Sequence, residues 1–245
     1  FISNDLTKVE NNIYSANNGN AALGDVLQNV AIQGDNAYLI LNNSNKIEVV
    51  NRYTFKKVAT VSDQVSQPRY MAFANNHYYV TNSSGSAKFV NVYSVSTNTL
   101  VKKIDLANNG ERIVEAGGKI IVQNASFGSG KKLTIINPTS NTVESIVTLP
   151  NGNIQKTISN GGNVYTIAKT ATDSYIYKLS PTGDITSTIT LTGLANATNL
   201  EIDGSKFFFT AGSNVYTMEM SSTTTPTTPI ITIADNSWSA MYGFN

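Results

Sequence analysis

The chain has 245 residues, of which 40% are apolar and only 13% are charged, and its 17 basic residues nearly balance its 16 acidic ones. Because the net charge is small and the basic residues form no stripe, nucleic acid is not an expected partner. The absence of cysteine excludes a disulfide framework, a thiolate nucleophile and a thiolate metal site. No apolar run approaches the roughly 18 residues of a membrane span, so we expect no transmembrane segment.

In chain order, residues 1–18 are expected to hold two strands, over 1–3 and 8–14, that end an earlier repeat. After them, a tight polar turn followed by an apolar or aromatic residue recurs five times. Gly and Asn suit these turns because two-residue hairpins need positive φ. The last residues of successive copies are 40, 42, 44 and 43 apart. The copies cover residues 34–38, 74–78, 116–120, 160–164 and 203–207.

Each copy of the turn joins the first two of four predicted strands, in which Val, Ile, Tyr and Thr dominate. The first strand of a further unit is expected at 238–245. The five complete repeats and their strands are 27–63 (29–32, 38–41, 46–50, 57–61), 67–106 (70–73, 78–81, 89–93, 100–104), 110–149 (112–115, 120–123, 133–136, 143–147), 153–191 (156–159, 164–168, 175–179, 185–191) and 197–233 (199–202, 207–210, 215–218, 230–233).

Four antiparallel strands in each period of about 40 residues predict an all-β fold, a β-propeller whose repeats are its blades. A β-sandwich is the alternative, but a sandwich does not repeat one turn chemistry at a four-strand period. We therefore expect residues 1–245 to form a single propeller domain. The two ends supply three strands where a closing blade needs four. We expect a segment of a larger ring, and six imperfectly closed blades are the alternative.

The residues that could carry catalysis or hold a metal do not form a recognisable set. His77 is the single histidine, so it cannot build an ordinary transition-metal site without a second His or Cys. Residues 128–132 resemble a phosphate-binding loop, but no helix is predicted after them. Glu111 and Glu115, four apart on a strand, would be some 13 Å apart, too far for paired hydrolytic carboxylates. We expect no enzyme activity, no cofactor and no metal.

The candidate binding residues lie where a propeller gathers its loops, at the mouth of the central channel. Aligned on the turn, the first strands begin at residues 29–30, 69–70, 111–112, 155–156 and 198–199. The predicted ligand-binding or partner-binding residues of this face are Gln28, Asn29, Asn43, Arg69, Tyr70, Arg112, Asn124, Phe127, Lys156, Lys169, Trp238 and Tyr242.

Three interpretations of this polar rim stay open. Its side chains can simply remain hydrated at the channel mouth. They can also bind an anionic or amide-rich small molecule, because Arg forks hold carboxylate or phosphate and aromatic faces stack on rings. Tyr, Trp and Arg are equally the usual anchors of protein interfaces, so the rim can instead grip a partner protein.

Several segments give the chain a family resemblance: residues 18–29, residues 42–50 followed by 67–70, the turn at 137–138 and the closing residues 242–244. Together they resemble the YncE-like surface propellers of Bacteroidota over almost the whole chain. The resemblance implies seven blades, secretion, and a lipid anchor on the outer membrane. The chain departs from the family in lacking its amino-terminal strand and its final portion.

The same resemblance implies a function without catalysis at the cell surface or as a secreted protein. It suggests capture of a nutrient such as a corrinoid or a siderophore for a partner TonB-dependent transporter or other outer-membrane protein. The alternative is a structural or assembly subunit that binds another envelope protein through the loop face of the propeller.

Overall fold

The computed structural model describes residues 2–3, 5–84, 87–126 and 128–234. Consecutive strands form five antiparallel four-stranded sheets, which we call blades 1 to 5. The blades comprise β1 (Leu27–Gln33), β2 (Asn36–Leu41), β3 (Lys46–Asn51) and β4 (Lys57–Val61); β5 (Pro68–Ala74), β6 (His77–Ser84), β7 (Ala87–Ser94) and β8 (Leu100–Asp105); β9 (Ile113–Ala116), β10 (Lys119–Ser126), β11 (Ser129–Asn137) and β12 (Thr142–Thr148); β13 (Asn153–Asn160), β14 (Asn163–Lys169), β15 (Ser174–Leu179) and β16 (Ile185–Leu191); and β17 (Ala197–Asp203), β18 (Lys206–Ala211), β19 (Asn214–Glu219) and β20 (Ile231–Thr232).

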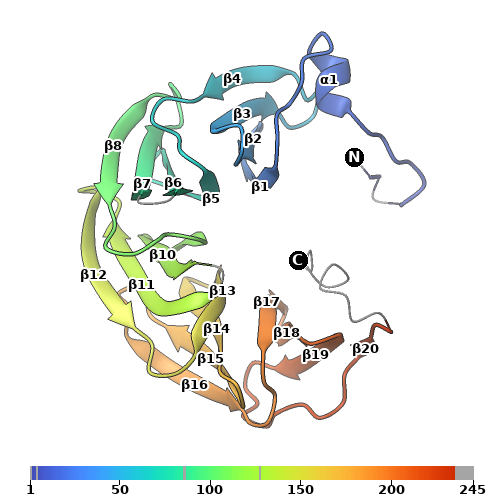
Figure 1. Ribbon diagram of the computed structural model, residues 1–245, viewed down its shortest axis with the longest axis vertical. Coiled ribbons are helices and arrows are strands. Elements are labelled where there is room, and N and C mark those ends of the chain that lie inside the picture. The colour runs from blue at the N-terminus through green and yellow to red at the C-terminus, as the bar shows by residue number, and fades with distance from the viewer. Residues whose placement is uncertain (1, 4, 85–86, 127, 235–245) are drawn as a thin grey trace.

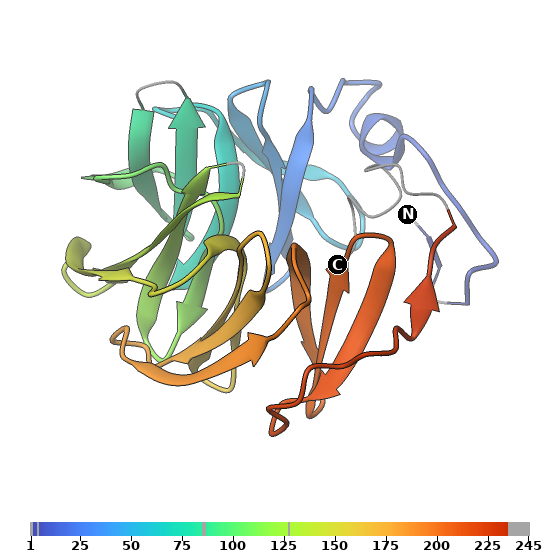
Figure 2. The ribbon, with the colours of Figure 1, turned by 60° about the horizontal axis from the view of Figure 1, so that its bottom comes forward.

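The blades follow one another around an arc, which confirms the predicted propeller architecture (Figure 1). The first strands β1, β5, β13 and β17 lie on the inside of the arc, whereas β4, β8, β12 and β16 lie at its rim. The arc opens between blade 5 and blade 1. A second view shows the blades as tilted sheets set side by side (Figure 2).

The core consists of apolar layers between neighbouring blades. Between blades 1 and 2, the rings of Tyr38, Tyr78 and Tyr93 are fully buried. The ring centroids of Tyr38 and Tyr78 are 5.1 Å apart, and those of Tyr78 and Tyr93 are 5.2 Å apart. Similar layers join blades 2 and 3, blades 3 and 4, and blades 4 and 5. Because both faces of an inner blade are covered, its central strands are apolar on both sides.

The predicted hairpin turns adopt two backbone conformations. At residues 75–76, 117–118 and 161–162 both central residues have positive φ, as a type I′ turn requires. In the turns of blades 1 and 5 only the first residue, Gly34 or Gly204, has positive φ, the pattern of a type II′ turn. Each of these turns holds β-strands one and two of its blade in register.

The register in blade 1 corrects the sequence alignment by one residue. Gln33 pairs with Asn36, and in blade 2 Ala74 pairs with His77, so Ala37 and not Tyr38 is the equivalent of Tyr78. By the same register, the pair equivalent to Arg69 and Tyr70 is residues 28–29, where the sequence alignment gave 29–30.

The amino-terminal segment differs from the two strands expected there. Ile2 and Val9 form an isolated antiparallel bridge, but residues Ile13–Asn17 form the short helix α1. The left-handed backbone of Asn12, with φ of 57°, ends the extended segment before the helix. Tyr14 is thereby buried against Ala37, Leu39 and Val50 of blade 1. Residues 238–245, the expected first strand of a further blade, lie outside the described residues.

Candidate functional site

The candidate site is built on irregularities at the start of the first strands. The pairing of β1, β5, β13 and β17 with its neighbour shifts in register near this end, as a β-bulge does. A bulge adds residues to one strand and turns their side chains toward a new direction. The equivalent residue pairs in the five blades are 28–29, 69–70, 111–112, 155–156 and 198–199.

Side chains from blades 1, 2 and 3 meet at this level. The Arg69 Nε donates hydrogen bonds to both Glu111 carboxylate oxygens, at 3.0 and 3.2 Å, and its Nη1 donates to Gln28 Oε1 at 2.6 Å. Gln28 Nε2 in turn donates to the Tyr70 hydroxyl at 3.3 Å. Charge-assisted bonds of this kind are the stronger class of hydrogen bond. The guanidinium therefore links three successive blades across the channel mouth.

A second ion pair joins blades 4 and 5. The Lys156 ammonium donates to Glu201 Oε1, and the Lys156 side chain is only 4% exposed whereas that of Glu201 is 34% exposed. Burial lowers the pKa of Lys156, its hydrogen bond to Glu201 opposes this effect, and the charge of Arg112 lowers the pKa further.

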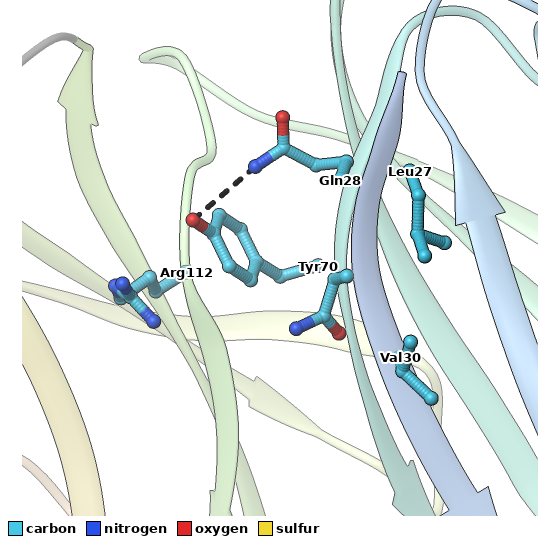
Figure 3. A pocket seen from close by; sticks show the side chains of 6 residues that line it. Leu27, Gln28, Val30, Tyr70 and Arg112 are labelled. Atoms are coloured by element: carbon cyan, nitrogen blue, oxygen red, sulfur yellow. Dashed lines mark hydrogen bonds between the residues drawn. The ribbon is translucent and has the colours of Figure 1, made fainter. Parts of the chain in front are cut away.

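Arg112 lies over the ring of Tyr70, with its Cζ 4.7 Å from the ring centroid. Both side chains line a pocket of about 450 Å³, together with Leu27, Gln28, Asn29 and Val30. In Figure 3, Gln28 points to the Tyr70 hydroxyl and Arg112 lies on the other side of the ring. Leu27 and Val30 lie on the opposite side of the blade 1 strand from Tyr70 and Arg112. A guanidinium, amides and an aromatic ring therefore share one side of β1, and the two apolar side chains lie on its other side.

The structure brings together half of the predicted site residues. Gln28, Asn29, Tyr70 and Arg112 line the pocket, Arg69 is bonded to Gln28, and the charge of Arg112 contributes to the lowered pKa of Lys156.

The other predicted residues do not join this group. Asn43 donates to Asp25 Oδ2 at 3.0 Å in the turn after β2. Asn124 is buried, and its Oδ1 accepts a hydrogen bond of 2.6 Å from the Thr134 hydroxyl, so its role is structural. Lys169 ends β14 and does not line the pocket. Phe127, Trp238 and Tyr242 lie outside the described residues.

Sequence reasoning missed four residues of the site. Glu111 is considered in the sequence only as an acid–base carboxylate, whereas in the structure it binds Arg69. Glu201, which binds Lys156, is not among the predicted site residues. Leu27 and Val30 also line the pocket, from the side of β1 away from Tyr70. Opposite charges at equivalent positions of adjacent repeats, such as Arg69 and Glu111, are the signal that could have found the first pair.

The residues considered above for catalysis or phosphate binding have structural positions. Glu115 accepts a hydrogen bond from the Gly118 amide in its hairpin, so it is not paired with Glu111. Ser129, Gly130 and the residues up to 132 lie in strand β11 and not in a phosphate-binding loop. Across the part of the chain that the structure describes, no three His, Asp or Glu side chains are grouped as a metal site requires. In that same part, no helix has the length and apolar character needed to cross a membrane.

Radial four-stranded blades around a central channel, with a polar site at its mouth, define a β-propeller protein. Within that class, the chain belongs to the family described as domain of unknown function DUF5074, whose sequence profile matches residues 1–244. None of the curated proteins matches the chain.

Solved propeller structures resemble the chain at low identity. Hydrazine synthase of Kuenenia stuttgartiensis has a TM-score of 0.66 at 15% identity, over 81% of this chain and 65% of that one. The Pan2 WD40 domain of Neurospora crassa has a TM-score of 0.62 at 9% identity, over 79% and 61%. The Dos1 propeller also has 0.62, at 10% identity, over 80% and 55%. The chain spans less than two thirds of the length of these structures, and the likeness shows the fold alone.

Proposed function

We propose that this protein binds a ligand at the channel mouth and carries out no catalysis. The observation that supports this proposal is the linked network of Gln28, Arg69, Tyr70 and Glu111 beside an open pocket of about 450 Å³. Ligand sites of this size combine apolar walls with a few fixed polar groups. Hydrogen bonds between blades hold those groups in place before a ligand arrives, which lowers the entropic cost of binding.

The absence of catalysis is part of the proposal. Each carboxylate at the mouth is engaged by a cation, Glu111 by Arg69 and Glu201 by Lys156. The oxygens of such a carboxylate are occupied by the cation, so they are not directed at a substrate proton. We expect hydrolase and oxidoreductase screens to give no turnover. A turnover that is lost on replacing Glu111, Glu201 or His77 would contradict this part.

The direct test is a search for binding at the mouth by NMR with isotope-labelled protein and a broad metabolite library. We expect ligand-induced shifts to centre on residues 27–30, 70 and 112. Lys206→Gln, an exposed change in the hairpin of blade 5, is the matched control and should leave the shifts unchanged. Shifts confined to other surfaces, or no shifts from any small or macromolecular candidate, would overturn the proposal.

The resemblance to YncE-like surface propellers adds a finer proposal, in which the ligand is a nutrient such as a corrinoid or a siderophore. The bound nutrient would then pass to a TonB-dependent transporter of the outer membrane. Calorimetry against corrinoids, haem and ferric siderophores tests the ligand, and affinity capture from native membranes tests the transporter. Failure of both would remove this finer proposal and leave binding at the mouth intact.

A second candidate is a structural or assembly subunit that binds another envelope protein. It is favoured by exposed apolar residues on the uncovered face of blade 1, Val26, Leu27, Val30 and Ile32. Contiguous exposed apolar side chains commonly mark protein interfaces. Capture of a stable protein partner that Val30→Lys abolishes and Arg112→Gln leaves intact would favour this candidate over a small ligand.

A further inference from the structure

The geometry points to Arg112 as the anchor for the carboxylate of a small hydrophilic molecule, one that carries hydroxyl groups and no large apolar part. This inference rests on the proposed binding function and names the ligand class of the same pocket. Four observations carry it: the ion pairs of the mouth, the way Arg112 is held, the polar groups beside it, and the net charge of the mouth.

The ion pairs of the mouth leave Arg112 without an acidic partner. Arg69 is paired with Glu111, at the boundary of blades 2 and 3. Lys156 is paired with Glu201, at the boundary of blades 4 and 5. No described residue accepts a hydrogen bond from the Arg112 guanidinium or forms an ion pair with it, although it lines the pocket. A half-buried guanidinium without an acceptor in the protein gains from an anion that enters the pocket.

The side chain of Arg112 is held in place before a ligand arrives. Its Cζ lies 4.7 Å from the centroid of the Tyr70 ring, and this cation–π contact leaves the N–H groups available as donors. Tyr70 is itself fixed, because its hydroxyl accepts a hydrogen bond from Gln28 and its backbone N–H donates to Thr81 Oγ1 at 3.1 Å. A guanidinium restrained in this way can offer two parallel hydrogen bonds to one carboxylate.

The groups beside Arg112 favour a hydrophilic ligand. Leu27 and Val30 lie on the other side of β1, so no apolar side chain of this strand faces Arg112 (Figure 3). The Asn29 amide lines the pocket, and no described residue forms a hydrogen bond with it. The Tyr70 hydroxyl acts as an acceptor in its hydrogen bond and so keeps its own O–H as a donor. An apolar ligand would cover these groups without satisfying them, whereas hydroxyl groups can bond to both.

The net charge of the mouth favours a monoanion. Three cations, Arg69, Arg112 and Lys156, are set against two carboxylates, Glu111 and Glu201, which leaves a charge of +1. One carboxylate neutralises this charge, whereas a phosphate monoester, with about −1.5 to −2 at neutral pH, would leave an excess of negative charge in a partly buried site. The ligand class is therefore that of hydroxy acids and sugar acids with a single carboxylate.

The experiment uses gluconate as the probe, titrated into the labelled whole chain to about 50 mM, because a ligand of this size is expected to bind with a Kd of the order of millimolar. Three analogues are titrated in parallel: sorbitol lacks the carboxylate, hexanoate lacks the hydroxyl groups, and sorbitol 6-phosphate carries a phosphate monoester instead. We expect gluconate to bind at least tenfold more tightly than sorbitol and severalfold more tightly than the other two. We also expect its binding to weaken as salt is raised, since the contact is ionic.

Substitution of Arg112 tests the anchor. Arg112→Gln should weaken gluconate binding about 10- to 100-fold, the usual effect of losing a hydrogen bond to a charged group. Arg112→Lys, which keeps the charge without the planar fork, should fall between this variant and the original protein. Arg52→Gln is the matched control, because Arg52 also lies over a tyrosine ring, at 5.2 Å from the centroid of Tyr53, but outside the pocket. This control should bind as the original protein does.

Substitution of Asn29 tests the hydrophilic part of the ligand class. Asn29→Ala should weaken gluconate binding severalfold, since it removes a neutral hydrogen-bonding group. It should leave the weaker binding of hexanoate unchanged, because hexanoate has no hydroxyl for the amide to bond. An equal effect of Asn29→Ala on both ligands would contradict a contact between the amide and the hydroxyl groups.

Equal binding of gluconate and sorbitol, tighter binding of hexanoate or sorbitol 6-phosphate, or equal binding by the Arg112→Gln and Arg52→Gln variants would each overturn the inference. So would the absence of gluconate binding over the whole titration. If another ligand or a protein still binds at the mouth in that case, the binding function stands and only its ligand class is wrong. Thermal unfolding of each variant establishes that a loss of binding is not a loss of fold.

Discussion

Val30 and Ile113 occupy the same position in the first strands of blades 1 and 3, but Val30 is 47% exposed and Ile113 only 5%. Ile113 packs on Tyr79, Val90 and Val92 of the preceding blade. Val30 lies on the face of blade 1 that the described blades leave uncovered, where Tyr14, Leu23 and Phe55 pack against Ala37, Leu39 and Val50 of β2 and β3. The repeat therefore specifies the strand, whereas the neighbouring blade decides how much the strand buries.

The largest expected effect of this difference is on stability. Ile113→Ala should lower the free energy of unfolding by about 2–5 kcal/mol, because it removes buried methylenes and leaves a cavity between blades 2 and 3. Val30→Ala should lower it by less than about 1 kcal/mol, since half of that side chain already faces water. Urea denaturation of the two variants measures both values. Equal losses would mean that the Val30 face is covered in solution.

The next effect concerns the ion pair between blades 4 and 5, which is buried at one end only. Glu201→Gln leaves the almost fully buried Lys156 ammonium without its carboxylate and should cost up to about 3 kcal/mol. Lys156→Met leaves Glu201, which is 34% exposed and can be hydrated, so its cost should be smaller. Denaturant unfolding at neutral pH gives the order of the two. A larger loss for Lys156→Met would show that the packing of its stem outweighs the charge.

The pH dependence of stability also tests the cost of burying the Lys156 ammonium. Because burial lowers the pKa of Lys156 in the native chain, the unfolded chain binds more protons between that pKa and the ordinary value of 10.5. The destabilising contribution of Lys156 is therefore complete below its native pKa and disappears as pH rises to 10.5. The stability of the original protein relative to Lys156→Met should increase over this range.

The comparison with Lys156→Met removes the effect of the buried tyrosines. Burial raises the pKa of Tyr79 and Tyr93 to about 12, so both proteins lose stability equally as pH rises above 10. Unfolding curves at several pH values between 8 and 10.5 measure the difference. A constant difference between the two proteins would contradict the lowered pKa of Lys156.

The fold was predictable because its signal is local and repeated. Two-residue turns rich in Gly and Asn recur at a nearly constant spacing, and this spacing gives the blades. The register of blade 1 was not predictable in the same way, since β2 (Asn36–Leu41) is buried on both faces. A slip of one residue moves side chains to the other face, and here both faces are apolar, so polarity does not reveal it.

The site was predictable only where it depends on position in the repeat. Gln28, Arg69, Tyr70, Arg112 and Lys156 follow from alignment on the turns. Glu201 does not, because the strand pairing shifts between Thr198 and Glu201, and Asn199 has a positive φ of 54°. This irregularity brings Glu201 to Lys156 of the preceding blade. Sequence patterns mark hairpins more clearly than they mark bulges.

The smallest expected effect is that of Val30→Lys, which asks directly whether the open face of blade 1 stays open. In the described structure the new side chain can lay its stem along β1 and keep its ammonium in water, so the free energy of unfolding should change by about 0.5 kcal/mol or less. Ile113→Lys, at the equivalent position, should prevent folding because it buries an unpaired charge. Urea denaturation and sedimentation of Val30→Lys test the expectation. A loss of several kcal/mol, or the dissociation of an assembly, would show that another surface covers Val30 in solution. The exposed apolar residues of blade 1 would then form an interface and not part of a small-molecule pocket.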